Sequence, residues 1–285
     1  MPCSKRLALI GYGAIGQEIA AACAGLGETG GLVAVLVRPG RRADALPAAH
    51  DVQALLATKP DVVLECAGHQ AVRDFGAAVL AAGADLIVSS VGALADNNLV
   101  TALRRASEVG GGRLLLPPGA IAGLDGLAAA RLAGLDRVAY TSHKPPHAWR
   151  GTAAEQVIDL DHAEDELVFF EGSAREAALA YPKNANVSIA VALAGIGMDR
   201  TRVRLVSSRK VADPLGVIEA EGAFGRFLFE ILGAASASNP KTSALTAYSL
   251  LQSARLGFAL PILQLIDEDQ GGRQPFHYAF AGDSL

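Results

Sequence analysis

Three glycines near the N-terminus have the spacing of a phosphate-binding turn. Gly11, Gly13 and Gly16 form G-x-G-x-x-G, and Ala14 and Ile15 lie between the last two glycines. In such a turn the first glycine permits a tight bend, the second lets a pyrophosphate approach the main chain, and the third lets a helix pack closely on the preceding strand. Free N–H groups at the start of that helix favour the negative phosphates. The five residues predict a dinucleotide site; the alternative is a purely structural turn.

Three arginines follow the second apolar run of the chain. Arg38, Arg41 and Arg42 come directly after Leu32–Val37. In NAD-specific folds an Asp or Glu at this point binds the adenosine ribose, whereas a nearby Arg accommodates the 2′-phosphate of NADP. The acid is missing here, so we expect Arg38 to contact the cofactor and NADP to be at least tolerated. The alternative is that all three arginines are merely solvated.

A second group of reactive side chains lies in one short segment, His143-Lys144-Pro145-Pro146-His147. Two prolines stiffen the segment, which brings two imidazoles and an ammonium into one loop. Imidazole suits proton transfer near neutral pH, and lysine offers a point charge to a carboxylate. We therefore take His143, Lys144 and His147 as catalytic candidates, against the alternative of an ordinary surface loop.

The composition is that of a globular protein with a sizeable core. The chain has 285 residues, 51% of them hydrophobic and 19% charged, with a net charge of −4. There is no basic tract to suggest nucleic acid, no apolar run as long as a membrane span, and no signal-peptide core. The cysteines Cys3, Cys23 and Cys66 lack metal-site spacing and are typical of reduced thiols. We expect a cytoplasmic protein without a metal, nucleic acid or membrane partner.

The elements that would position these residues alternate between strand and helix. Predicted strands occur at 7–10, 32–37, 61–66, 85–90 and 113–118, with helical patterns between them. This order predicts an α/β fold with a doubly wound parallel sheet, which binds ligands beyond the carboxyl ends of its strands. Small residues follow three of those strands, and they would let a nicotinamide ribose lie against the main chain: Ala67-Gly68, Gly92-Ala93 and Gly119-Ala120.

The pattern changes after Asp125, where runs of strands predict a second, α+β domain. We expect residues 1–121 to form the nucleotide domain and residues 122–238 a substrate and dimerisation domain. Residues 239–285 would then return to the first domain. Asn239 as N-cap and Pro240 at the first helical position predict a helix from there to Leu256.

Several motifs together resemble the L-aspartate dehydrogenase family over nearly the whole chain, to about Leu256. They are Glu65-Cys66-Ala67-Gly68-His69, Ser90-Val91-Gly92-Ala93-Leu94, Pro118-Gly119-Ala120-Ile121, Tyr181-Pro182-Lys183-Asn184-Ala185-Asn186-Val187, Gly222-Ala223-Phe224-Gly225 and Asn239-Pro240-Lys241-Thr242-Ser243. The resemblance implies a Rossmann domain plus an α+β domain, and a homodimer. It implies NAD or NADP as cofactor and places cofactor contacts at Ala120 and Asn186.

The activity implied is oxidation of L-aspartate to iminoaspartate, which hydrolyses to oxaloacetate and ammonia or feeds NAD biosynthesis. The family's catalytic histidine precedes the Gly-x-Phe-Gly motif, and in this sequence its position is occupied by Gly216. We therefore expect His143 or His147 to replace it or to select another substrate. Lys144, Lys183 and Lys241 could bind a dicarboxylate, and His69 could make a structural or nicotinamide-side contact. Alternatives are a paralogue acting on another amino acid, imine or carbonyl compound, and an NAD(P)-binding protein without catalysis.

Overall fold

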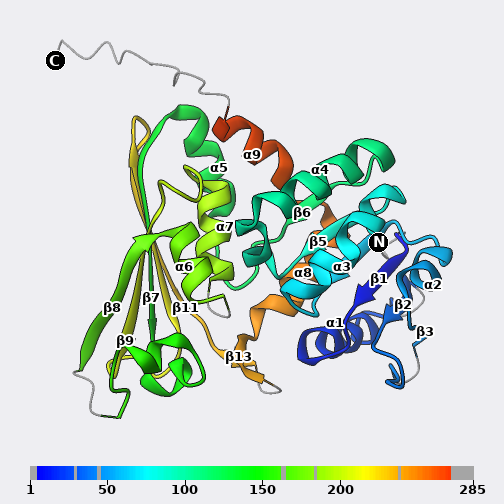
Figure 1. Ribbon diagram of the computed structural model, residues 1–285, viewed down its shortest axis with the longest axis horizontal. Helices are drawn as coiled ribbons and strands as arrows, with labels where there is room; N and C mark the ends of the chain where they lie inside the picture. The colour runs from blue at the N-terminus through cyan, green and yellow to red at the C-terminus, as the bar shows by residue number, and fades with distance from the viewer. Residues whose placement is uncertain are drawn as a thin grey trace.

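Two large β-sheets, one in each half of the molecule, dominate the computed structural model (Figure 1). The structure describes residues 5–28, 31–43, 46–161, 165–182, 185–236 and 239–270. Among these residues, no helix has both the length and the apolar character needed to cross a bilayer.

The first sheet has the strand order β14-β6-β5-β4-β1-β2-β3. Its strands are β1 (Leu7–Ile10), β2 (Leu32–Leu36), β3 (Ala48–Ala49), β4 (Val62–Glu65), β5 (Asp85–Val88), β6 (Leu114–Leu116) and β14 (Leu260–Pro261). All pairs among β1 to β6 are parallel, and only the edge strand β14 is antiparallel. The order reverses at β1, so the ligand crevice of such a sheet opens beyond its carboxyl end. The predicted doubly wound fold is confirmed.

Helices cover both faces of this sheet. They are α1 (Ala14–Gly25), α2 (Val52–Ala57), α3 (His69–Ala81), α4 (Asn97–Gly110) and, from the far end of the chain, α8 (Leu245–Leu256). Helix α8 packs against α1, β4 and β5, and its apolar residues share one core with Leu7 and Leu9 of β1. The strands between the helices are buried on both faces, which explains their continuous apolar runs.

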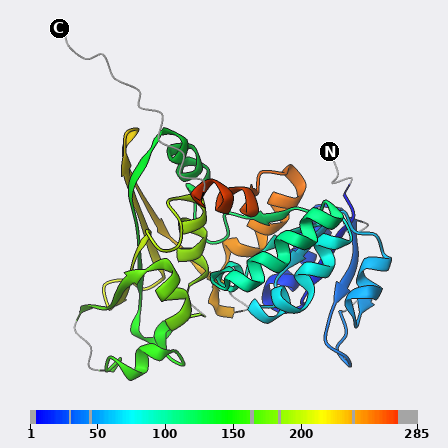
Figure 2. The same cartoon turned by 45° about the horizontal axis from the view of Figure 1, so that its top comes forward.

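The second sheet is mixed and has the order β11-β10-β7-β9-β8. Its strands are β7 (Leu135–Lys144), β8 (Glu166–Ser173), β9 (Arg202–Ser208), β10 (Leu215–Gly222) and β11 (Gly225–Leu232). The helices α5 (Leu124–Ala133), α6 (Ala174–Ala180) and α7 (Asn186–Ala194) lie on the side toward the first sheet, and no described element covers the other side (Figures 1 and 2). We call these two sides the inner and the outer face. The expected second α+β domain is confirmed.

The C-terminal part differs from the prediction at one point. Residues Asn239–Ser243 form strand β13, which pairs with β12 (Ala235–Ser236), and α8 begins only at Leu245. Asn239 is therefore not a helix N-cap, because the ladder with β12 takes up the main chain that a first helical turn would need. After β14, helix α9 (Ile262–Gln270) ends the described chain.

Candidate nucleotide and substrate site

The glycine turn lies between β1 and α1 and has the geometry that a bound pyrophosphate requires. The Gly11 N–H donates to the Leu36 carbonyl at 2.9 Å, and its φ of +99° suits glycine. A Cβ on Gly11 would lie 2.8 Å from the Ala67 Cβ, and one on Gly16 would lie 2.5 Å from the Gly11 carbonyl oxygen. A Cβ on Gly13 would meet nothing within 4 Å. The main chain is thus tightly packed at Gly11 and Gly16 but has open space next to Gly13, where a phosphate could approach it.

A buried carboxylate, Glu65 at the end of β4, holds the neighbouring loops in place. It is 0% exposed and accepts hydrogen bonds from the N–H groups of Ala67 and Gly68, both at 2.8 Å, and from Ser90 N–H and hydroxyl, both at 3.0 Å. Burial raises the pKa of Glu65, and these hydrogen bonds oppose that shift. The predicted cofactor residues Ala67 and Gly68 are therefore fixed at the carboxyl edge of the sheet. Glu65 is part of a motif that carries the family resemblance, but no role was predicted for it, although an acid ending a buried apolar strand was a usable signal.

Asn186, the first residue of α7, connects the second half of the chain to the nucleotide domain. Its Oδ1 accepts from the Gly92 N–H at 2.9 Å and lies 2.9 Å from Nε2 of His69. Because Oδ1 accepts, the hydrogen bond assigns the His69 proton to Nε2. A Cβ on Gly92 would lie 2.7 Å from the His69 ring, so this contact needs glycine. His69 and Asn186 therefore form one link between the domains.

The predicted cofactor residue Ala120 lies on a turn that is fastened to α8. Gly119, with a φ of +68°, donates its N–H to the Ser249 hydroxyl at 2.8 Å. The turn follows β6 at the carboxyl edge of the sheet, the same edge as the glycine turn. The structure thus brings Ala120 to the edge where the cofactor residues of β1 and β4 lie.

The segment at the end of β7 is divided between the two faces of the second sheet. His143 lies on the outer face, with Nδ1 3.6 Å from Glu166 Oε1, whereas Lys144 points to the inner face. The Lys144 ammonium lies 5.0 Å from the centre of the Trp149 ring, and burial lowers its pKa to about 8. His147 is exposed in the 3-10 helix η3 (Pro146–Trp149). The structure therefore does not bring the two imidazoles together with Lys144.

Gly216 lies on β10 opposite Ser142 of β7, on the inner face. A Cβ on Gly216 would lie 3.3 Å from both Cε2 and the hydroxyl of Tyr140. Tyr140 is buried and its hydroxyl is hydrogen-bonded to Ser142; burial raises its pKa to about 12. A protonated hydroxyl thus occupies the space in front of Gly216. Strand alternation puts Tyr140, Ser142 and Lys144 on one face, but Tyr140 was not among the predicted site residues.

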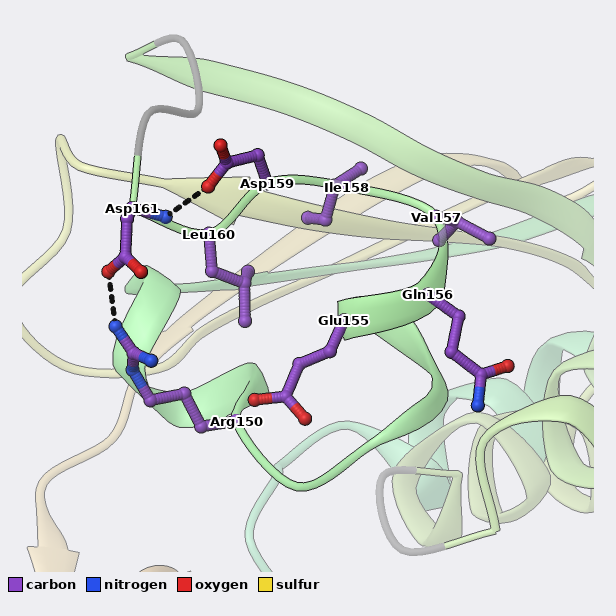
Figure 3. Close-up of a pocket in the computed structure, with 8 residues that line it drawn as sticks. All are labelled: Arg150, Glu155, Gln156, Val157, Ile158, Asp159, Leu160 and Asp161. Carbon is purple, nitrogen blue, oxygen red and sulfur yellow. Dashed lines mark hydrogen bonds and ion pairs between the residues drawn. The ribbon is translucent and has the colours of Figure 1, made fainter.

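A hollow near η3 is a separate surface feature. It is lined by Arg150 and by residues 155–161, all from one segment, and an ion pair joins Arg150 to Asp161 across it (Figure 3). None of the predicted site residues lines this hollow. Lys183 lies outside the described residues, as does the side chain of Lys241. Within the described ranges, no three His, Cys, Asp or Glu side chains are grouped as metal ligands would be.

Comparison with known proteins gives matches over both halves of the chain. The profile of the homoserine dehydrogenase NAD binding domain matches residues 11–117, and that of the aspartate dehydrogenase C-terminal domain matches residues 125–256. L-aspartate dehydrogenase of Ruegeria pomeroyi is 48% identical over 256 residues, covering 88% of this chain and 91% of that protein. The Pseudomonas aeruginosa enzyme of the same name is 47% identical over 221 residues, covering 78% and 80%.

A solved structure, aspartate dehydrogenase from Thermotoga maritima, has a similar fold. It superposes with a TM-score of 0.70 at 24% identity, covering 88% of this chain and 95% of that one. Together with the open main chain at Gly13, the NAD-binding profile confirms the expected cofactor, NAD or NADP.

Proposed function

The chain belongs to the L-aspartate dehydrogenase family, and on that premise we propose that it oxidises L-aspartate to iminoaspartate with NAD or NADP. The observation that carries this proposal is 48% identity to an L-aspartate dehydrogenase across 88% of the chain. The imine would hydrolyse to oxaloacetate and ammonia or be used for NAD biosynthesis. We place the reaction in the cytoplasm.

The residues of the crevice support a division of labour. The main chain at Gly11, Gly13, Ala14, Ile15 and Gly16 would bind the pyrophosphate. The nicotinamide end would find room beside the small residues Ala67, Gly68 and Ala120. Asn186 would keep α7 next to that end through its hydrogen bonds with Gly92 and His69. When bound, the oxidised cofactor supplies the hydride acceptor.

Lys144 is the residue that we propose for a substrate carboxylate. Its ammonium is partly buried on the inner face, where a lysine charge gains from an anionic partner. Ser207, its partner across the β7–β9 ladder, is 0% exposed, and its hydroxyl has no hydrogen-bond partner among the described residues. His143 and His147 stay predictions as proton-transfer groups. Alanine at both positions with unchanged turnover would exclude them.

One observation favours a second candidate function. Glycine has no side chain to move a proton, and at position 216 it faces the Tyr140 hydroxyl. A neutral hydroxyl with a pKa of about 12 can donate a hydrogen bond but is a poor base at neutral pH. The chain would then act on another amino acid, imine or carbonyl compound, or bind the cofactor without turnover.

Reduction of NAD and NADP, assayed with aspartate and a panel of other amino acids, tests the proposal. We expect turnover with aspartate. Gly216→His, in which the Tyr140 side chain must rotate away to admit the imidazole, should raise that turnover, with Gly216→Ala as the matched control. A typical general acid–base group contributes about 10²–10⁴-fold. Turnover with another substrate alone would establish the second candidate. Saturable cofactor binding without turnover on any substrate would indicate a binding protein.

The uncovered outer face of the second sheet supports a homodimer. Val168 and Leu228 are 49% and 48% exposed there, and Leu232 is 70% exposed. Two ion pairs lie on the same face, Arg137 with Glu219 and Arg202 with Glu171, so the face carries both positive and negative charges. A face with apolar residues and both charges can be complementary to itself across a two-fold axis. We propose a second copy of this chain as its partner.

A further inference from the structure

The end of β2 is held in a fixed position beside the glycine turn. The carbonyl of Leu36 accepts from the Gly11 N–H at 2.9 Å, and the Val37 N–H donates to the Ala49 carbonyl at 2.9 Å. The end of β2 is thus hydrogen-bonded on one side to the glycine turn, which would bind the pyrophosphate, and on the other side to β3. The residues directly after Val37 lie where the adenosine ribose of a dinucleotide is found in this fold.

The chain after Val37 makes a tight turn that begins and ends with arginine. The Arg41 N–H donates to the Arg38 carbonyl at 3.0 Å, with Pro39 and Gly40 between them and a φ of +79° at Gly40. Proline at the second position and a positive φ at the third are the features of a type II turn. After Arg42 the chain is anchored again, because Ala43 is buried at 1% exposure. Three guanidinium groups therefore extend from a turn that is fixed at both ends.

The guanidinium groups of these three arginines have no protein partner among the described residues. Arg38, Arg41 and Arg42 are exposed and make neither a hydrogen bond nor an ion pair with a side chain of the described ranges. Other arginines are paired, such as Arg113 with Asp85 and Arg255 with Glu28.

The carboxylates close to the turn in the sequence do not change this. Asp51 accepts from the Ala54 N–H at 2.7 Å at the start of α2, and Asp44 lies outside the described residues. Three positive charges so close together repel one another unless an anion lies between them.

We propose that Arg38, Arg41 and Arg42 form a binding site for the 2′-phosphate of NADP, and that the chain binds NADP(H) more tightly than NAD(H). A phosphate monoester offers charged oxygens that guanidinium groups bind through paired hydrogen bonds. The inference rests on the proposed oxidoreductase function only for the choice of ligand, since it concerns the adenosine end of the crevice and not the chemistry at the nicotinamide.

Fluorescence titration of the full chain with NADPH and with NADH tests this proposal without requiring turnover. We expect NADPH to bind more tightly to the wild type. The triple variant Arg38→Ala, Arg41→Ala, Arg42→Ala should raise the dissociation constant for NADPH by about 10- to 100-fold, the range of one or more lost charged hydrogen bonds. The constant for NADH should stay within about two-fold. The three single variants then show which arginine contributes most.

Arg105→Ala is the matched control, because Arg105 is exposed on α4 and also makes no described pair. Competition with adenosine 2′,5′-bisphosphate and with 5′-AMP isolates the contribution of the 2′-phosphate. The proposal is overturned if the wild type prefers NADH, or if the triple variant weakens both cofactors equally or neither. Tight NADPH binding without aspartate oxidation would refute the proposed function but leave this inference standing.

Discussion

Single residues on the inner face of the second sheet determine which groups near the site are protonated. Tyr140, Ser142 and Lys144 alternate along β7 and share this face with Gly216. A hydroxyl held neutral by burial and an ammonium that loses its proton more readily than usual lie on one strand. Burial thus raises the pKa of Tyr140 and lowers that of Lys144. The Tyr140 hydroxyl is therefore suited to donating a hydrogen bond, and the Lys144 ammonium to changing its charge with pH near neutrality.

Lys144 predicts a pH dependence of stability. Its pKa is about 8 in the folded chain and 10.5, the ordinary value, when unfolded. Between these values the unfolded state binds more protons, so the contribution of Lys144 to stability rises with pH through that window. Below about pH 8 both states are protonated and the buried charge is fully unfavourable. Lys144→Met should therefore be more stable than the wild type near neutral pH, with a difference that shrinks as the pH rises towards the unfolded-state pKa.

Thermal unfolding measured across this range checks the sign, with Lys210→Met as the control for loss of an exposed lysine paired with Glu166. The same Lys144 variant should raise the KM for aspartate if the ammonium binds a carboxylate. A stability difference that is constant with pH, or that grows above about pH 8, would contradict the burial of a charged Lys144.

At the scale of elements, the first sheet was the most predictable part of the molecule. Its main strands are largely apolar runs, and small residues follow three of them, β4, β5 and β6. Helices α5 and α6 were not predicted, because their alanine-rich sequences have little apolar periodicity. For α6 a signal existed: Ser173 and Glu176 form a capping box, the S-x-x-E pattern of a helix start.

Contacts that join distant segments could not be predicted from the sequence. The glycine turn and the arginines after β2 are local patterns, so spacing alone identified them. The position of Tyr140 over Gly216 depends on the register between β7 and β10, and the two hydrogen bonds from Ser90 to Glu65 depend on two strand ends that meet only in the fold. The same reason explains His143: the motif suggested one loop, but the β7 strand continues through Lys144 and sends the two side chains to opposite faces.

The start of α7 predicts a link between cofactor binding and stability. Asn186→Ala would leave the Gly92 N–H and the His69 Nε2–H without their acceptor. The cost is about 1–3 kcal/mol for the buried Gly92 donor and less for the half-buried His69 ring, which water can reach. Asn186→Asp keeps an acceptor oxygen and should restore part of the loss. Urea denaturation and NADH titration of both variants test this. Unchanged unfolding and unchanged cofactor affinity in Asn186→Ala would show that the link carries no energy.

At the scale of the whole molecule, helices α5, α6 and α7 cover the inner face of the second sheet, and no described element covers its outer face (Figures 1 and 2). Sheets in soluble proteins commonly bury one face and leave the other solvated, and polar residues then alternate outward. Here the outward positions instead mix exposed Val168, Leu228 and Leu232 with ion pairs. Exposed apolar side chains interspersed with charges, on a sheet face that no described element covers, suit an interaction surface.

The homodimer predicted from this face can be tested in solution. Gel filtration with light scattering should give twice the chain mass of 29.3 kDa for the wild type. Lysine at Val168 and Leu228 together should give the mass of one chain, because each substitution would bury an unpaired charge in the contact. Val109→Lys on α4 is the control, since Val109 is 82% exposed on the nucleotide domain. A wild type with the mass of one chain, or a double variant that keeps twice that mass, would rule out this face.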